Sequence, residues 1–204
     1  MIIKLYSDTI DKKHLEEVCS CLDKGGVIIY PTDTLYAFAA KLGNLKGAER
    51  LANLKGKKFE KSCFSIVCKD ISQASEFTKP INNNTFKILK NNTPGEFAFI
   101  LEASTKIPKI LQTKRKTIGI RIPNNNVALS IVDFLDYPLI TSSLNTESEE
   151  EENYIHPELI YEEYQDKVDF VIDQGIGNNY KSTVVDLTCG DIEIIREGFG
   201  ELIY

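Results

Sequence analysis

The 204-residue chain lacks any long apolar run. None approaches the roughly 20 consecutive apolar residues that a transmembrane helix needs. The first ten residues, MIIKLYSDTI, contain no extended apolar core and no small-residue cleavage site, so the sequence predicts no signal peptide. With 42% hydrophobic and 26% charged residues, the composition is typical of a soluble globular protein. We expect a cytoplasmic protein without membrane contact, folded as one domain over residues 1–204.

The sequence also has only two histidines and no tryptophan. His14 lies in a predicted helix among charged residues and His156 follows a run of glutamates, so both are expected to be solvated or structural. The cysteines are odd in number and scattered, at positions 19, 21, 63, 68 and 189. No pair of them has metal-ligand spacing with a histidine, which predicts reduced, mostly buried thiols. The sequence therefore shows no catalytic triad and no metal motif.

Acidic residues outnumber basic ones by 30 to 24, which gives a net charge of −6. Nine of the 30 acidic residues fall between Glu147 and Asp166, a stretch without lysine or arginine, so the rest of the chain carries 24 basic residues against 21 acidic ones. Basic residues cluster at 55–61 and at 106–121. Such clusters are usually solvated faces, but two that converge on one surface would attract the phosphates of a nucleotide or of RNA.

Hydrophobic periodicity predicts alternating strands and helices. The predicted helices lie at 11–24, 44–56, 82–92, 124–135 and 157–165, and the predicted strands at 27–30, 63–68, 97–101, 117–122, 138–143, 169–173, 182–187 and 193–196. The early strand–helix alternation gives way to paired strands near the C-terminus. We therefore expect an α/β fold, a twisted sheet of mixed parallel and antiparallel strands with flanking helices.

The stretch VIIYPTDTLYAF (residues 27–38) runs a continuous apolar strand into a proline and short polar side chains. Pro31 has no N–H group, so it ends the strand pairing. Thr32, Asp33 and Thr34 then follow at a strand end, where open α/β sheets bind ligands. The alternative is a turn capped by Asp33, with the threonines bonding their own backbone.

Seven segments in order resemble the YrdC/YciO family, the threonylcarbamoyl-adenylate synthase superfamily. They are GGVIIYPTDTLYAF, LKGKK, NNTPGEFAFIL, IGIRIP, TSSLN, STVVDLT and IIREG, and they cover the chain from about residue 20 to 200. KNNTPG and KRKTIGIR look most like the YciO branch. The resemblance implies the YrdC-like fold, with a positively charged concave cavity.

The activity that the resemblance implies joins L-threonine, bicarbonate and ATP into threonylcarbamoyl-adenylate with release of pyrophosphate, for modification of a tRNA adenosine. Mg²⁺ normally shares the phosphate charge in such chemistry. The reaction needs charge neutralisation and alignment rather than a protein nucleophile.

The family roles carry over to matching positions of this sequence. Thr34, Arg121 and Thr183 match positions that contact the threonine substrate, with Arg121 suited to clamp its carboxylate. The nucleotide-binding positions are Lys55, Lys57, Ser143, Asn145 and Arg196. Purely structural roles are the alternatives to these binding roles. Lys55 would then be a lysine at a helix C-terminus, and Arg121 and Arg196 would be edge-strand arginines with surface partners.

The sequence departs from the family pattern at several positions. Lys57 replaces a family arginine, Ala98 replaces a threonine of the Pro-Gly strand, and Cys68 stands where a histidine is expected after the second strand. The glutamate run after Asn145 would disfavour a triphosphate if it lay over the cavity. Two functions follow: a synthase-like enzyme, or a protein that uses the same surface to bind double-stranded RNA or a nucleotide with little turnover.

Overall fold

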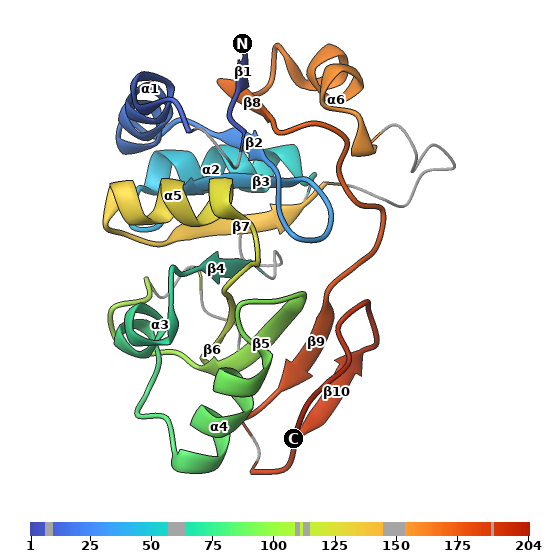
Figure 1. Cartoon of the computed structure of the whole chain (residues 1–204). Coiled ribbons are helices and arrows are strands. Elements are labelled where there is room, and N and C mark those ends of the chain that lie inside the picture. Colours follow the sequence, from blue (N-terminus) through green and yellow to red (C-terminus); the bar gives the residue numbers. More distant parts are fainter. Residues whose placement is uncertain (7–9, 57–63, 109–110, 112–114, 145–153, 189) are drawn as a thin grey trace.

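The computed structural model describes residues 1–6, 10–56, 64–108, 111, 115–144, 154–188 and 190–204. These residues form one 10-stranded sheet in the order β1-β8-β2-β3-β7-β4-β6-β5-β9-β10. The strands are β1 (Ile2–Lys4), β2 (Ile28–Tyr30), β3 (Ala37–Lys41), β4 (Ser65–Val67), β5 (Phe97–Glu102), β6 (Thr117–Arg121), β7 (Leu139–Ser143), β8 (Phe170–Asp173), β9 (Thr183–Asp186) and β10 (Glu193–Arg196). Figure 1 shows β1, β8, β2, β3 and β7 in the upper half of the molecule and β6, β5, β9 and β10 in the lower half.

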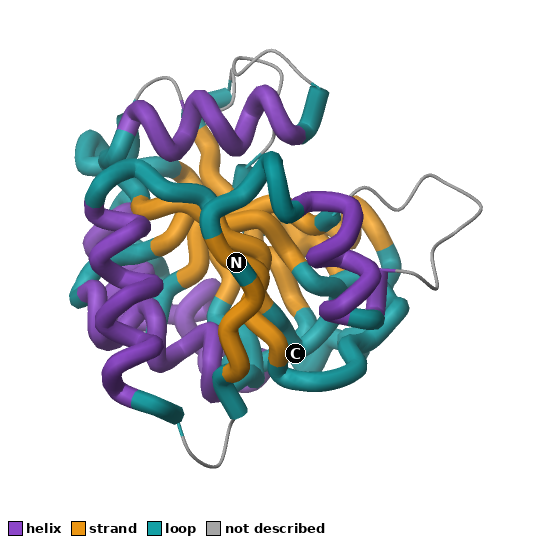
Figure 2. Tube along the Cα trace, turned by 90° about the horizontal axis from the view of Figure 1, so that it is seen from above, coloured by secondary structure: helices purple, strands orange, loops and turns teal. Residues whose placement is uncertain are grey.

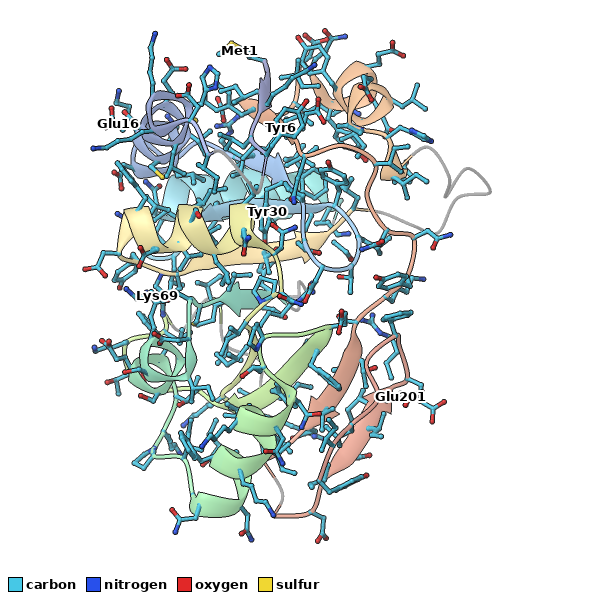
Figure 3. The ribbon with its side chains drawn as sticks, viewed as in Figure 1. Met1, Tyr6, Glu16, Tyr30, Lys69 and Glu201 are labelled. Atoms are coloured by element: carbon cyan, nitrogen blue, oxygen red, sulfur yellow. The ribbon has the colours of Figure 1, made fainter. Side chains whose placement is uncertain are left out.

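Strand β2 lies in the interior of the sheet, as its unbroken apolar run predicts. It pairs in parallel with β8 and antiparallel with β3, with Tyr30 opposite Ala37. Every β2 residue is fully buried, and Tyr30 lies in the middle of the molecule in Figure 3. The prediction for residues 27–30 and that of a mixed parallel and antiparallel sheet are both confirmed.

Helices cover both faces of the sheet, and Figure 2 shows them outside the strands. They are α1 (Lys12–Asp23), α2 (Leu45–Leu54), α3 (Ile71–Phe77), α4 (Asn83–Asn92), α5 (Asn126–Leu135) and α6 (Pro157–Tyr164). Short polar residues begin most of them: Asp11, Asn44, Asp70, Asn82 and Asn125 each accept a hydrogen bond from a backbone N–H of the first turn. Among the described residues, no helix is long and apolar enough to cross a membrane.

The two faces of the sheet pack against different helices. One face, which carries Phe38, Ile66 and Ile120, packs against α2, α3, α4 and α6 in a large apolar core. The opposite face carries Tyr30 and Leu139 and packs against α1 and α5 in a smaller core. That smaller core takes in residues of β1, β2, β3, β4, β7 and β8 but none of β5, β6, β9 or β10. On this second face, β5, β6, β9 and β10 therefore do not contribute to the core formed with α1 and α5.

The sequence predicted all of these elements except β1, β3 and α3. Strand β3, AFAAK, is rich in alanine, which has low strand propensity, and its position is fixed by pairing with β2 and β7. Helix α3 is only seven residues long. The expected pairing of the C-terminal strands holds for β9 with β10, whereas β8 lies at the other end of the sheet between β1 and β2.

The cysteines that the structure describes agree with the prediction of reduced, mostly buried thiols. Cys19 and Cys68 are buried, Cys21 is half-buried, and all three are free. Burial raises the pKa of the Cys19 thiol to about 12 and that of Cys21 to about 11. Cys63 and Cys189 lie outside the described residues.

Candidate functional site

Hydrogen bonds between Thr32 and the backbone of its own loop stabilise the loop after β2. The Thr32 hydroxyl donates to the Leu35 carbonyl at 2.7 Å and accepts from the Thr34 backbone N–H at 3.0 Å. The expectation that a threonine bonds its own backbone is therefore confirmed for Thr32. The turn leaves the side chains of Asp33 and Thr34 pointing at another part of the molecule.

Asp33 and Thr34 both bind Arg121 at the end of β6. Arg121 Nη2 lies 2.7 Å from Asp33 Oδ1 and 3.0 Å from Thr34 Oγ1. Both charged side chains are almost inaccessible, at 9% exposure for Arg121 and 3% for Asp33. The second Asp33 oxygen accepts from the Asn124 backbone N–H at 2.8 Å. Asp33 thus anchors the loop to β6, instead of capping its own turn.

The charges in this pair are incompletely compensated. Burial raises the pKa of Asp33, although Arg121 and the Asn124 N–H partly oppose that shift. Arg121 Nε is buried without a hydrogen-bond partner. A guanidinium that keeps an unused donor in a buried position is poised to bind a further acceptor.

Register places a second arginine in the same row across the sheet. Because Phe99 pairs with Ile120, the next row holds Ala98 beside Arg121; Ala98 pairs with Val184, which pairs with Arg196. Paired residues point to the same face, and this is the face opposite Phe99 and Ile120 of the large core. We call the surface carrying Ala98, Arg121, Val184 and Arg196 the arginine face.

The two arginines of this face lie within electrostatic reach of each other. Neighbouring strands are about 4.8 Å apart, so three strand spacings separate their backbones by about 14 Å. Burial, and then the positive charge of Arg121, lower the pKa of Arg196. An anion bound at this row would be attracted by both positive charges.

Arg196 is held by the backbone before β9. Its Nη2 donates to the Ser182 carbonyl at 2.7 Å and lies 3.3 Å from the Ser182 hydroxyl. Strand β10 is an edge strand, as one alternative for Arg196 expected, but its partner Ser182 is buried. The same alternative is wrong for Arg121, which lies on the interior strand β6 and pairs with a buried carboxylate.

Thr183, a predicted substrate-binding residue, has an evident structural contact. Its hydroxyl donates to the Gly200 carbonyl at 2.7 Å and accepts from the Gly198 N–H at 3.1 Å. Thr183 pairs with Phe97, whose side chain belongs to the large core. The hydroxyl therefore fastens residues 198–200 to β9, and its contact with a substrate stays a prediction.

Replacing Thr183 by valine removes both hydrogen bonds at nearly constant volume. Since the residue is 2% exposed, we expect the free energy of unfolding to fall by about 1–3 kcal/mol. Thr183→Ser keeps the hydroxyl and is the matched control. Urea denaturation of both variants checks this, and a valine variant as stable as the wild-type protein would show that the hydroxyl contributes nothing.

Lys55 and Ser143, two of the predicted nucleotide-binding residues, lie together, and their contact with a nucleotide stays a prediction. Lys55 is the C-cap residue of α2, which agrees with the alternative of a lysine at a helix C-terminus, and its Nζ donates to the Ser143 carbonyl at 2.8 Å. Ser143 pairs with Ala37 on β3. Residues 34–37 therefore connect this pair to the contact between Thr34 and Arg121.

Some predicted features cannot be placed at the site. Lys57, Asn145 and the glutamate run that follows Asn145 lie outside the described residues. Cys68 is fully buried in the large core, on the face opposite Arg121, so it does not stand in for a substrate-side histidine. Whether the predicted residues line one positively charged cavity stays a prediction; the structure shows that Thr34 bonds Arg121 and that Arg196 lies in the same cross-strand row as Arg121.

Sequence reasoning did not select Ser182 or Asn178 as site residues. Ser182 touches Arg196, and Asn178 Nδ2 donates to the Asp33 carbonyl at 3.1 Å. The segment between them passes from the Asp33 loop to Arg196. Ser182 lies in the STVVDLT segment of the resemblance, but its contact with Arg196, like that of Asn178 with Asp33, depends on which segments the sheet brings together.

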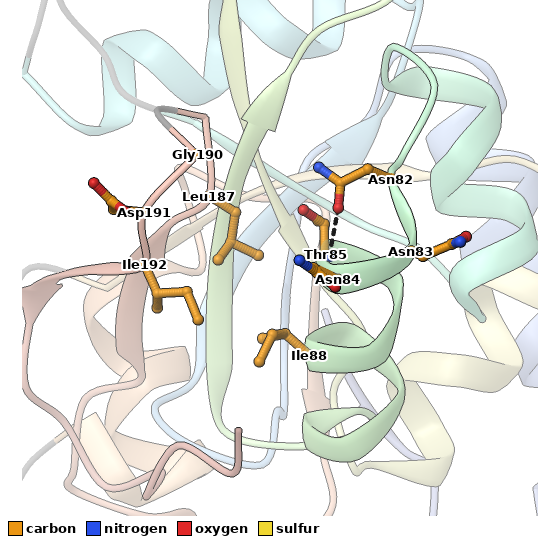
Figure 4. A pocket seen from close by; sticks show the side chains of 9 residues that line it. All are labelled: Asn82, Asn83, Asn84, Thr85, Ile88, Leu187, Gly190, Asp191 and Ile192. Carbon is orange, nitrogen blue, oxygen red and sulfur yellow. Dashed lines mark hydrogen bonds between the residues drawn. The ribbon is translucent and has the colours of Figure 1, made fainter.

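A separate pocket of about 380 Å³ lies between the start of α4 and the residues that precede β10 (Figure 4). Its side chains include Asn82, Ile88, Asp191 and Ile192, and none of the predicted site residues. Asn82 is already used to cap α4 through the Thr85 N–H. In the part of the chain that the structure describes, no group of three His, Cys, Asp or Glu side chains is placed to hold a metal ion.

Similarity to known proteins agrees with this fold. The family model described as telomere recombination, covering Sua5, YciO and YrdC, matches residues 20–198. An uncharacterized protein of Haemophilus influenzae is 38% identical over 96% of this chain and 94% of its own length. A putative threonylcarbamoyl-AMP synthase of Methanocaldococcus jannaschii is 34% identical over 97% of this chain and 92% of its own.

Two solved structures show the same architecture. The crystal structure of Escherichia coli YciO superposes with a TM-score of 0.91 at 32% identity and covers 98% of this chain and 97% of that one. The structure of Pyrococcus abyssi Sua5 complexed with L-threonine gives a TM-score of 0.87 at 22% identity, over 97% of this chain and 57% of that longer one. The chain therefore belongs to the Sua5/YciO/YrdC family.

Proposed function

We propose that this protein is a threonylcarbamoyl-AMP synthase-like enzyme, which joins L-threonine, bicarbonate and ATP on the arginine face. The observation that carries the proposal is the cross-strand row in which Arg121 and Arg196 share one face with the small residue Ala98 between them. Arg121 keeps a buried Nε without a partner, Arg196 lies in the same row, and both substrates offer the anions that such donors would bind.

The relatives support the same reaction class. The M. jannaschii relative is named a putative threonylcarbamoyl-AMP synthase, and the Sua5 structure contains L-threonine. The H. influenzae relative and E. coli YciO, which match this chain over almost its full length, carry no assigned activity. Family membership supports the general class of reaction, and the residues of the arginine face are the specific argument for a synthase.

In this proposal, each residue binds the substrate group that its charge or hydrogen-bonding group matches. Arg121, oriented by Asp33, would hold the threonine carboxylate next to the Thr34 hydroxyl. The threonine amine combines with bicarbonate, losing water, to give a carbamate. A carbamate oxygen then bonds to the α-phosphorus of ATP as the bond to the pyrophosphate oxygen breaks. Arg196 and Lys55 would hold the phosphates in line for that transfer.

Magnesium belongs to this proposal as the partner of ATP. Because no metal-binding group of acids is seen among the described residues, we expect Mg²⁺ to arrive on the nucleotide phosphates. Bound there, it would neutralise phosphate charge. The protein's own contribution is to position the substrates with fixed cations.

The proposal is tested with purified protein, ATP, Mg²⁺, L-threonine and bicarbonate. We expect pyrophosphate release that depends on both L-threonine and bicarbonate, together with threonylcarbamoyl-AMP detected by mass spectrometry. Pyrophosphate release without the adenylate, or no release at concentrations that saturate ATP binding, would contradict the synthase.

The alternative function, binding of tRNA or double-stranded RNA with little turnover, predicts a different result. RNA contacts would depend on the number of cations and weaken steeply with salt, and would not need Thr34. Salt-dependent RNA affinity that survives Thr34→Ala, combined with no effect of L-threonine on any measured property, would favour this alternative.

A further inference from the structure

An aromatic pair lies beside the arginine face. The rings of Tyr180 and Phe199 stack with centroids 3.9 Å apart and planes 16° from parallel. Phe199 is 56% exposed although one side of its ring is covered by Tyr180. A large apolar side chain held in a fixed stack but left open to solvent offers a flat surface for another planar group.

The pair is fixed in place by the same segments that carry the site. The Phe199 N–H donates to the Lys181 carbonyl at 2.9 Å, and the Gly198 N–H bonds the Thr183 hydroxyl. Gly198 is needed there, because a Cβ atom would collide with the Lys181 carbonyl oxygen. These contacts therefore hold residues 198–200 against residues 181–183.

In the sequence, Tyr180 lies between a residue that contacts the Asp33 loop and a residue that contacts Arg196. Two residues before it, Asn178 bonds the Asp33 carbonyl; two residues after it, Ser182 bonds Arg196. The Asn178 bond keeps this segment beside the Asp33 loop, and burial, followed by the carboxylates of Glu96 and Asp33, raises the pKa of the Tyr180 phenol. The aromatic pair is thus at the rim of the arginine face rather than on a remote surface.

We infer that the open face of Phe199, backed by Tyr180, stacks against the nucleobase of the nucleotide whose phosphates bind the arginine face. This inference rests on the proposed function and adds the group that recognises the base. Stacking accepts any flat base, whereas phosphate-binding cations do not distinguish a nucleotide from inorganic polyphosphate. The pair would therefore give ATP an advantage over tripolyphosphate.

The test compares ATP with inorganic tripolyphosphate by calorimetric titration at equal free Mg²⁺. We expect the wild-type protein to bind ATP more tightly than tripolyphosphate, and Phe199→Leu to lose roughly five- to hundredfold in ATP affinity with tripolyphosphate affinity unchanged. Phe199→Tyr keeps a ring and should retain the preference for ATP. Phe86→Leu changes another exposed phenylalanine, on α4, and should alter neither affinity.

The outcomes separate this inference from the function on which it rests. Tight tripolyphosphate binding with equal ATP affinity in wild-type and Phe199→Leu protein would overturn stacking and keep the anion site. Absence of binding by both ligands to the wild-type protein would overturn both proposals. A Phe199 effect on a single-stranded oligonucleotide but not on ATP would also overturn the inference. A general loss of folding in Phe199→Leu would abolish binding of both ATP and tripolyphosphate, which distinguishes it from a loss of stacking.

Discussion

Replacing Arg121 by methionine is expected to lower the free energy of unfolding by about 3–5 kcal/mol, on the order of 10 °C in Tm. The side chain is 9% exposed and its partner Asp33 3%, so the substitution leaves a buried carboxylate without its counter-charge. The measurement is urea denaturation at pH 7.5. Arg50→Met is the matched control, since Arg50 bonds Asp169 at the same 2.7 Å while 35% exposed, and should cost at most about 1 kcal/mol.

The same variant has a pH dependence with a defined sign. Burial raises the pKa of Asp33, and Arg121 opposes that shift, so removing Arg121 raises the pKa further. A carboxyl group whose pKa is higher in the folded state than in the unfolded state binds its proton more tightly when folded. Stability therefore recovers as the pH falls through the folded pKa toward the unfolded value near 3.8.

Two results would contradict this account of the Asp33–Arg121 pair. The stability deficit of Arg121→Met should shrink as the pH is lowered from about 7.5 to about 5. It should shrink similarly when Asp33→Asn is added, because the amide carries no buried charge. A deficit that is constant with pH and unchanged in the double variant would mean that lost packing, not the orphaned carboxylate, causes it.

Replacing Arg196 by glutamine is expected to weaken ATP binding by about tenfold to a hundredfold with little change in stability. Loss of a charge-assisted hydrogen bond to phosphate lowers affinity. The repulsion from Arg121, which helps to lower the pKa of Arg196, disappears at the same time and offsets the lost bonds to Ser182. Calorimetric titration with ATP, paired with thermal unfolding, gives both quantities.

Arg115→Gln is the control for Arg196, because Arg115 is 76% exposed and its nearest acidic partner, Asp186, is 3.8 Å away. It should leave ATP affinity unchanged. A comparable loss in both variants would show that general positive charge, and not the position on the arginine face, attracts the nucleotide. A large loss of stability in Arg196→Gln with unchanged affinity would make Arg196 a structural residue of the β9–β10 pair.

Sequence patterns predicted the elements with strong periodicity or caps and missed those that depend on the rest of the sheet. The apolar run 27–30 and the capped helix after Asn44 follow from local rules. Strand β3 does not, because its alanines have low strand propensity and pair on both sides only once the sheet exists. The order of the strands likewise required the structure, since β8 returns to the opposite end of the sheet from β9.

For the candidate site, the resemblance named residues but not their arrangement. The resemblance picked out Thr34, Arg121 and Arg196, and the structure joins the first two by a hydrogen bond. It did not reveal that Arg121 and Arg196 share a cross-strand row, because that row depends on β5 and β9 pairing in parallel. Nor did it select Ser182, whose contact with Arg196 spans 14 positions.

A crystal structure of the protein grown with L-threonine and a non-hydrolysable ATP analogue tests the central claim most directly. The account predicts phosphate oxygens within hydrogen-bond distance of Arg196 and the threonine carboxylate at Arg121, with Asp33 still bonded to Arg121. Nucleotide bound instead in the pocket whose lining includes Lys24, Lys46 and Arg50, with the arginine face free of ligand, would contradict it.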